Sequence, residues 1–361
     1  GHAKLKKIDT NISAGLPGVI GIYTGQDCLA DNLGEIPHSP FPSTQFDLKL
    51  KPSASAAGKK FTGTHTLLPI DRGRYVGEPI AMVVAETKAE ANDAAESIKI
   101  DYEILEAVVD ARAAAGSNAP KLYDEISDNV FVETFFGNEK ETNSVFDSAD
   151  HVVRMSFDIP RVTGVPLEPR SALGFYDEKT KKYTIYAGSG GTVRQKREIA
   201  SVLGVDPKQV RVFALDVGGN FGTRNRLFVE FPLVAWASKK VGRPVKFTCE
   251  RSESFISDYQ GRDLTVDMEL ALNSDGNFLA LRSSNISNIG AKCVSLSPLS
   301  KGSGIITGSY RIPVAHLRSR ATFSNTPPTN AYRSSGRPEI IYCIECLVEK
   351  ASRDLGFDSI E

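Results

Sequence analysis

A glycine-rich segment near the middle of the chain carries the residues best suited to bind a small molecule. Residues 211–217 read as a buried strand, and a glycine-rich turn follows them up to Thr223. A backbone with several glycines can approach an anion closely and offer it N–H groups. A helix predicted from about Asn225 would add the positive end of its dipole. The pattern predicts a cradle for a cofactor or substrate, with Phe221 displayed at its mouth.

Another glycine loop, at 188–191, has the same context; it is the first of the two along the chain, and the loop at 218–222 is the second. It follows a strand predicted over 182–187 and precedes a helix predicted over 192–203, so two strand–loop–helix units are expected side by side. Neither loop has the Gly-x-Gly-x-x-Gly pattern or the Lys-Ser/Thr ending of a P-loop. A nicotinamide dinucleotide site or an ATP site is therefore not expected.

Composition narrows the class of protein. The chain has 361 residues and a formal net charge of −1, from 43 basic and 44 acidic side chains, so no nucleic acid partner is expected. No apolar run is long enough to span a membrane, which predicts a soluble protein. The five cysteines are scattered and odd in number, and no signal peptide is visible. These features favour a reducing compartment, and we expect a cytoplasmic protein.

The elements predicted around the loops divide into two units. Residues 1–106 read as a compact α/β unit, with strands at 18–23 and 99–103, a buried strand ending at 85, and a helix at 87–98. A Pro/Ser/Gly/Lys-rich stretch at about 30–65 predicts a long surface excursion. The composition loosens after 107, which predicts a linker over 107–128.

The second unit is expected over residues 129–361. It should contain a strand at 151–159 and an amphipathic helix at 227–240, in addition to the strand–loop–helix elements. Strands at 264–272 and 278–284 flank the turn 273–277 and predict a hairpin. A last helix is predicted over 338–355, because Pro and Glu stand in its first turn and Gly356 follows it.

Six motifs, in matching order and spacing, resemble the molybdenum-binding subunit of the xanthine dehydrogenase/aldehyde oxidase/carbon monoxide dehydrogenase family. They lie at 74–79, 100–103, 165–170, 216–222, 242–246 and 331–339. The resemblance covers nearly the whole chain. It implies an α+β fold: an α/β-hammerhead domain followed by a mixed α/β molybdopterin-binding domain, the first of the family's two molybdenum-cofactor domains.

The resemblance also implies a chemistry. Family members hydroxylate a carbon with water as the oxygen source, and a molybdenum–pterin cofactor (molybdopterin or its cytosine dinucleotide) accepts two electrons. The electrons leave through [2Fe-2S] clusters to FAD, usually on partner subunits. The catalytic base and the second cofactor domain are expected outside this chain. We therefore expect a chain that is inactive without partners, which supply the second cofactor domain, the iron–sulfur clusters and FAD.

The same resemblance assigns site residues. Phe221 would pack against the substrate, Asn225 would contact its edge, and the Gly222 N–H would face the metal's oxo ligand. The cofactor-binding residues would be Gly190, Gly218, Gly219, Phe221, Gly222, Ala331, Tyr332 and Arg333. No metal ligand is expected from this chain.

Three positions depart from particular family members, and two of them narrow the range of expected substrates. Gly190 replaces a glutamine that bonds the oxo ligand in many members. Asn225 replaces the glutamate of purine-oxidising members, so a purine is not expected. Ser334 replaces the copper-binding cysteine of carbon monoxide dehydrogenases, so carbon monoxide oxidation is not expected. An aldehyde or an N-heteroaromatic compound is the expected substrate.

Two other classes of function stay open. Gly190 and Asn225 fit a non-catalytic scaffold paralogue that kept the fold and lost the site. The glycine loops alone would also fit an unrelated phosphate-ligand binding module.

Other candidate groups have structural interpretations. Glu168 and Arg170 are expected to form an ion pair at a domain seam, and the charges around Arg194 and Glu198 are interpreted as a solvated helix face. Cys343 and Cys346 are expected to be small buried side chains, because no second cysteine pair with ligand spacing exists.

Overall fold

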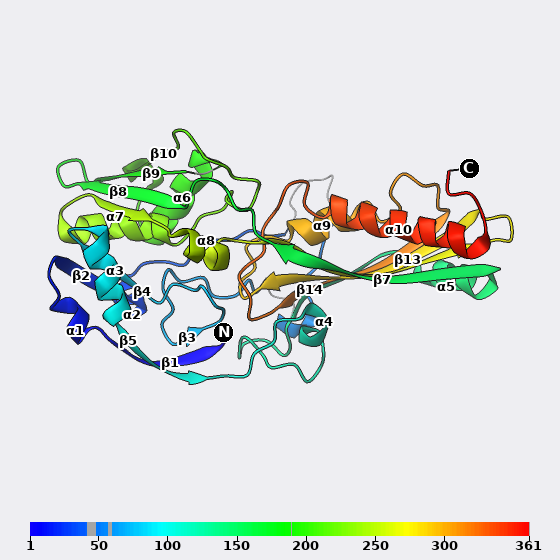
Figure 1. Cartoon of the computed structure of the whole chain (residues 1–361), viewed down its shortest axis with the longest axis horizontal. Coiled ribbons are helices and arrows are strands. Elements are labelled where there is room, and N and C mark those ends of the chain that lie inside the picture. Colours follow the sequence, from blue (N-terminus) through cyan, green and yellow to red (C-terminus); the bar gives the residue numbers. More distant parts are fainter. Residues whose placement is uncertain (42–47, 57–59, 189, 361) are drawn as a thin grey trace.

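The computed structural model describes residues 1–41, 48–56, 60–188 and 190–360. The molecule is elongated, with most of the N-terminal unit and a four-stranded sheet at one end and a long five-stranded sheet at the other (Figure 1). Each end has its own large hydrophobic core.

The N-terminal unit contains two small antiparallel sheets, in the orders β3-β1-β5 and β2-β4. Thr87 and Glu90 form a capping box that starts the helix α3. The predicted strands at 18–23, ending at 85, and at 99–103 are confirmed, as is the helix at 87–98. The elements are β1 (Ala3–Asp9), α1 (Asn11–Ala14), β2 (Val19–Thr24), α2 (Gly25–Ala30), β3 (Arg72–Gly73), β4 (Ala81–Ala85), α3 (Lys88–Ser97) and β5 (Lys99–Ile104).

The prediction of a surface excursion at 30–65 is wrong for the part that the structure describes. Ile36 is buried in the core at one end of the molecule and Leu50 in the core at the other. The apolar residues in this polar stretch are spaced irregularly, so no period revealed that they would be buried. Residues 42–47 and 57–59 of this segment lie outside the described residues.

The segment expected as a linker, 107–128, also packs into the core. It contains the helix α4 (Ala111–Ala114), and both Leu122 and Tyr123 are fully buried. The Tyr123 hydroxyl donates a hydrogen bond of 2.7 Å to the Ala291 carbonyl. This contact fixes the segment against the second unit.

The five-stranded sheet has the order β6-β14-β13-β12-β7. Leu264, Val266, Met268 and Leu270 alternate along β12 and are buried, as a sheet with one face on the core requires. The predicted strand at 151–159, the hairpin and the last helix are confirmed, while β6, α5, α9 and β14 were not predicted. The elements are β6 (Val130–Gly137), α5 (Glu139–Ser148), β7 (His151–Val162), β12 (Gly261–Leu272), β13 (Phe278–Gly290), α9 (Ser297–Ser303), β14 (Val314–Phe323) and α10 (Arg337–Leu355).

The four-stranded sheet, in the order β10-β9-β8-β11, carries the glycine loops. Strands β9 and β10 are parallel neighbours, so the loops that follow them begin at the same edge of the sheet. The predicted strand at 182–187 and the helix at 192–203 are confirmed. The elements are β8 (Ser171–Asp177), β9 (Lys182–Ala187), α6 (Thr192–Leu203), β10 (Val210–Phe213), α7 (Glu230–Val241), β11 (Val245–Thr248) and α8 (Arg251–Ser257).

Three predictions about this sheet and the helix α7 are wrong. The strand before the second loop ends at Phe213, and Leu215 beyond it is exposed. The next helix begins at Glu230, not near 225 or 227, because Pro232 is tolerated only in a first helical turn. The helix α7 is buried over most of its length and is not amphipathic.

Candidate functional site

The two glycine loops meet in space. A Cβ atom placed on Gly190 would lie 2.8 Å from Asn220 Nδ2 and 3.5 Å from the Asn225 Cβ. The absence of a side chain at Gly190 therefore lets the second loop approach the first.

A third segment, 330–333, packs against the second loop. The Arg333 N–H donates a 2.9 Å hydrogen bond to the Phe221 carbonyl, and Asn330 Nδ2 donates to the Gly222 carbonyl at 3.1 Å. A Cβ atom on Gly222 would lie only 2.6 Å from the Ala331 carbonyl oxygen, so glycine is required there. Three stretches that are far apart in the chain thus converge on one surface.

Phe221 stands out within the second loop. Its φ of 51° lies in the left-handed region, which a residue with a bulky side chain rarely adopts. Its side chain is 46% exposed, although it is a large aromatic group. The hydrogen bond from Arg333 and the close approach of Gly222 to Ala331 hold the backbone in this conformation.

The other residues assigned from the sequence lie in the same three segments. Gly218 and Asn225 are exposed, and Gly219 lies against Pro166. The Asn225 Oδ1 accepts a 2.9 Å hydrogen bond from Asn330, which leaves the Asn225 amide nitrogen to donate elsewhere. Tyr332 stacks under the Arg262 guanidinium, 5.0 Å from the ring centroid.

Two of the loop N–H groups are bonded to side chains of this chain. The Gly218 N–H donates to Glu168 Oε2 at 2.7 Å, and the Gly222 N–H donates to Asn220 Oδ1 at 2.9 Å. The Gly222 N–H, expected to face a cofactor, is thus occupied by Asn220. Because α7 begins at Glu230, the helix that follows this loop does not have its N-terminus at Asn225, contrary to the prediction.

Asn220 is a residue that the sequence analysis missed. Its Nδ2 atom is buried and has no hydrogen-bond partner among the residues that the structure describes. It lies beside Gly190, where the two loops meet. The signal available in the sequence was the single polar side chain within Gly-Gly-Asn-Phe-Gly at 218–222.

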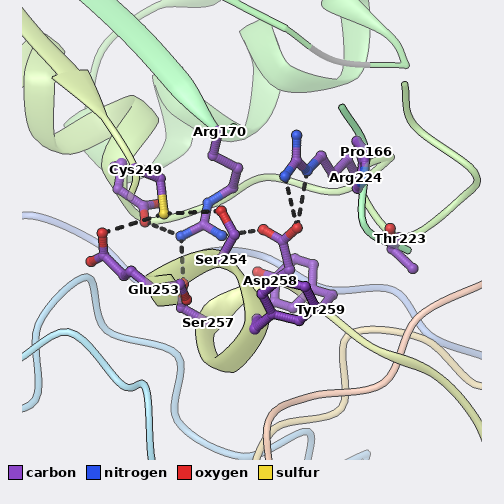
Figure 2. A network of polar contacts seen from close by, with 12 residues as sticks. Pro166, Arg170, Thr223, Arg224, Cys249, Glu253, Ser254, Ser257, Asp258 and Tyr259 are labelled. Atoms are coloured by element: carbon purple, nitrogen blue, oxygen red, sulfur yellow. Dashed lines mark hydrogen bonds and ion pairs between the residues drawn. The ribbon is translucent and has the colours of Figure 1, made fainter. Parts of the chain in front are cut away.

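A network of buried charged side chains anchors the loop at 218–225. Figure 2 shows Arg170 and Arg224 approaching the Asp258 carboxylate from two sides. Arg224 donates to Asp258 Oδ2 at 2.8 Å and also to the Glu168 carbonyl, and Arg170 donates to Glu230 at 2.6 Å. All four charged side chains are buried, and their charges cancel. The network ties the loop to the ends of β8, α7 and α8.

The expected Glu168–Arg170 ion pair is wrong. Arg170 pairs with Asp258 and Glu230, while the Glu168 carboxylate accepts from the Gly218 N–H. Burial by itself would lower the pKa of Arg170, but the charges of Glu230 and Asp258 outweigh it and raise that pKa. The Arg170 guanidinium therefore stays charged, which a neutral network requires.

Thiols and carboxylates outside the loops do not form a metal site in the part of the chain that the structure describes. Cys343 is fully buried, as predicted, and burial raises the pKa of its thiol to about 12. Cys346, also expected to be buried, is half-buried. Glu198 differs from the predicted solvated face, because burial raises the pKa of its carboxyl and one of its oxygens has no partner among the described residues.

Two histidines form a pair that the sequence spacing did not predict. His38 Nε2 and His65 Nδ1 lie 2.6 Å apart, although 27 residues separate them in the chain. Burial lowers the pKa of both rings, that of His38 to about 3. The pair is thus held neutral at ordinary pH.

No described helix combines the length and the apolar character needed to cross a membrane.

Known protein families match nearly the whole chain. Residues 1–106 match the aldehyde oxidase and xanthine dehydrogenase a/b hammerhead domain, and residues 122–361 match the molybdopterin cofactor-binding domain. The chain is 30% identical to subunit gamma of the 6-hydroxypseudooxynicotine dehydrogenase complex of Paenarthrobacter nicotinovorans, over 82% of this chain and 37% of that protein.

Solved structures match over 99% of the chain. A Cu,Mo-CO dehydrogenase superposes with a TM-score of 0.87 at 28% identity, and quinoline 2-oxidoreductase from Pseudomonas putida 86 with 0.86 at 29%. In both cases the chain covers 44% of the matched chain, so it spans less than half the length of these relatives.

These matches confirm the resemblance seen in the sequence, including a hammerhead domain followed by a mixed α/β cofactor-binding domain. The chain belongs to the molybdopterin-cofactor-binding family of aldehyde oxidases and xanthine dehydrogenases.

Proposed function

We propose that the chain supplies one half of the cofactor and substrate site of a molybdenum hydroxylase. The observation that carries the proposal is the convergence of Gly190, the loop 218–225 and the segment 331–333 on one open surface. The substrate would be an aldehyde or an N-heteroaromatic compound, with water as the source of the oxygen. A relative named for quinoline, an N-heteroaromatic compound, supports this class.

The residues present fit a bulky cofactor. Gly190 has no side chain where the two loops meet, and the buried Asn220 Nδ2 atom beside it is a donor with no partner among the described residues. Gly190, Gly218, Gly219, Phe221, Gly222, Ala331, Tyr332 and Arg333 would line the molybdenum–pterin group. When bound, that cofactor accepts the two electrons of the oxidation.

The roles of the chain's own side chains follow from their placement. Phe221, exposed and held by its backbone, would pack against a planar substrate. The Asn225 amide nitrogen would donate to an acceptor on the substrate edge, since its oxygen is already bonded to Asn330. Asn220 would donate through Nδ2 to the cofactor, because the Gly222 N–H is engaged by the Asn220 oxygen.

The remaining parts would come from beyond these residues. Because the chain covers 44% of the matched structures, the second molybdenum-cofactor domain and the catalytic base would lie in the other half. An iron–sulfur subunit with [2Fe-2S] clusters and an FAD subunit would carry the electrons away. A cytoplasmic location stays a prediction.

Metal analysis of the native protein tests the proposal. The complex would be purified from the source cells, and about one molybdenum and about four iron atoms are expected per copy of the chain, since two [2Fe-2S] clusters hold four irons. Turnover of aldehydes and quinoline-like compounds in ¹⁸O-labelled water should then place ¹⁸O in the product.

The two alternative functions predict other results. A complex without molybdenum would indicate a scaffold paralogue. Stoichiometric phosphate binding by a metal-free chain would indicate the phosphate-ligand binding module.

A further inference from the structure

A cavity of about 610 Å³ lies between part of the N-terminal unit and the four-stranded sheet. Its walls are β4, α3, the helix α7 and β11; Figure 1 shows α3 and β4 on the side of α7 away from β8. Every residue of β4 and every residue of β11 lines it. Successive residues of a strand point to opposite faces, so a cavity lined by all of them faces the edge of the strand.

Both strands have an unpaired edge within the described residues. The strand β11 is the last in the order β10-β9-β8-β11, and β2 is the one strand that pairs with β4 in the part of the chain that the structure describes. An edge strand directs every second N–H and C=O group away from its one partner.

The hydrogen bonds next to the strands show which backbone groups point outward. The Cys249 N–H donates to the Arg170 carbonyl at 2.8 Å, in register with the β11–β8 pairing. Backbone N–H and C=O groups of successive residues in an antiparallel strand point alternately toward and away from the partner strand. The backbone groups of Lys246 and Thr248 therefore point away from β8.

The same reasoning applies to β4. The Glu86 N–H donates to the Gly18 carbonyl at 2.9 Å. The backbone groups of Ala81, Val83 and Ala85 therefore point away from β2. Two rows of backbone donors and acceptors, neither with a strand partner among residues 1–41, 48–56, 60–188 and 190–360, thus border one cavity.

The side chains around the cavity favour a peptide of a particular kind. Met82, Leu233 and Phe247 make its interior apolar. Two ion pairs lie at its rim, Arg243 with Glu86 at 3.0 Å and Lys88 with Glu250. Lys246 is exposed and has no ion-pair partner among the described residues.

We propose that an extended segment of the second molybdenum-cofactor half enters this cavity as a β-strand and pairs with β4 and β11. One strand has two edges, so it can satisfy both rows of backbone groups and join the two sheets into one. The segment would be mainly apolar, with an acidic residue opposite Lys246.

The identity of the occupant rests on the proposed function and on the length of the relatives, of which the chain covers 44%. A small molecule is a poorer fit to these two rows, because the spacing of their donors and acceptors along β4 and β11 matches the spacing along another β-strand.

Hydrogen exchange tests the inference on the native complex. The amides of Ala81, Val83, Ala85, Lys246 and Thr248 should exchange at least tenfold more slowly in the assembled complex than in the isolated chain. A molybdenum-containing complex in which these five amides exchange as in the isolated chain would overturn the strand and leave the proposed function standing. If these amides exchange more slowly in the isolated chain as the concentration of that chain is raised, the inserted strand is also contradicted. That result would indicate that two copies of this chain pair through these edges.

Proline variants test the pairing directly. Val83→Pro and Lys246→Pro remove outward N–H groups, which an edge strand tolerates. Each should weaken association of the two halves by about tenfold or more, with the unfolding midpoint of the isolated chain retained. The matched control is Tyr102→Pro, on the outer edge of β5. The Leu105 N–H donates to the His2 carbonyl beside the strand pair β1–β5, so by the same alternation the Tyr102 N–H points away from β1, and Tyr102 does not line the cavity.

A charge variant keeps the inference testable if a proline variant fails to fold. Lys246→Glu should also weaken the association, and the loss should shrink as salt is raised. Equal weakening by Tyr102→Pro, or no effect of Lys246→Glu and the cavity prolines, would contradict the inserted strand.

Discussion

The Asn220 side chain has an oxygen that accepts a hydrogen bond within the loop and a nitrogen proposed to donate to the cofactor, and one substitution can separate the two. Asn220→Asp keeps the oxygen that accepts from the Gly222 N–H but removes the Nδ2 donor that has no partner among the described residues. Removing a donor preorganised toward developing charge typically costs about 10²–10³ in kcat. We therefore expect a loss of that order in the molybdenum-loaded complex.

The assay would measure kcat together with molybdenum per copy, so that cofactor loss and slow chemistry are distinguished. Asn277→Asp, in the turn between β12 and β13, is the control and should be close to wild type. Unchanged kcat in Asn220→Asp would remove Asn220 from the site.

The His38–His65 pair predicts a pH dependence of stability. Burial holds the pKa of both rings below the ordinary value, that of His38 at about 3. Between about pH 6.5 and 3 the unfolded chain therefore binds more protons than the folded one, and stability falls as pH falls. At about 1.4 kcal/mol per pKa unit, the titration of His38 alone lowers the free energy of unfolding by roughly 3 kcal/mol between pH 7 and pH 4, and His65 adds to that loss.

Urea titrations at pH 7 and pH 4 would measure this loss. His38→Gln removes one ionisable group, so its stability should fall less on acidification than that of the wild type. The same drop in both proteins would show that the pair does not control the acid sensitivity.

At the scale of elements, the charge network that anchors the second glycine loop predicts a large effect of a small change. Asp258→Asn leaves Arg170 and Arg224 buried with one negative partner, Glu230, instead of two. Breaking a buried ion pair from one side typically costs about 3–5 kcal/mol. We expect a loss of this size in the free energy of unfolding, measured with urea.

Lys350→Ala is the matched control for Asp258→Asn. It removes an exposed ion pair with Asp354 on α10, and such pairs contribute about 0.3–0.5 kcal/mol. Comparable losses in the two variants would argue that the network is not effectively buried.

The elements that the sequence predicted well are those with a clear period or clear end signals. The helix α3 begins at a capping box, and α10 ends at Gly356 in the left-handed conformation. The strand β14 was missed because its inward residues include Ser319, which is fully buried but polar, so the alternation is weak. Its outward Arg318 pairs with Glu133 on β6, a contact that no local pattern encodes.

The site shows the same division between local and tertiary information. The glycines and the one aromatic residue of the loop 218–222 predicted that it would bind a cofactor or substrate. The residues expected beside it in space were assigned through the family resemblance. The engagement of the Gly222 N–H by Asn220 depends on positive φ angles at Phe221 and Gly222. Those angles are held by contacts with Asn330, Ala331 and Arg333, more than 100 residues away in sequence.

At the scale of the whole molecule, the two units share one core. Ile36, Leu68 and Val84 of the N-terminal unit pack in the same cluster as Ile199 and Val234 of the second. Separating the units would expose this apolar surface, at a cost of about 25 cal/mol per Å². We therefore expect the chain to unfold in one transition, not unit by unit.

The single tryptophan of the chain reports on this contact. Trp236, on α7, packs edge-on against Tyr23 with ring centroids 4.9 Å apart, and its Nε1 donates to Asp31 at 2.8 Å. Tyr23 and Asp31 belong to the N-terminal unit, so separation of the units should expose the indole and shift its emission to longer wavelength. In urea, the emission shift and the loss of far-ultraviolet circular dichroism should share one midpoint.

Asp31→Ala removes the acceptor of the buried indole N–H and the partner of Lys240, which lies 2.7 Å from Asp31. An unsatisfied buried donor costs about 1–3 kcal/mol, so the free energy of unfolding should fall by about that amount and both midpoints should move together to lower urea. Asp31→Asn keeps an acceptor and should lose less. An emission shift that precedes the loss of circular dichroism would show instead that the N-terminal unit detaches before the second unit unfolds, and that the shared core does not couple them.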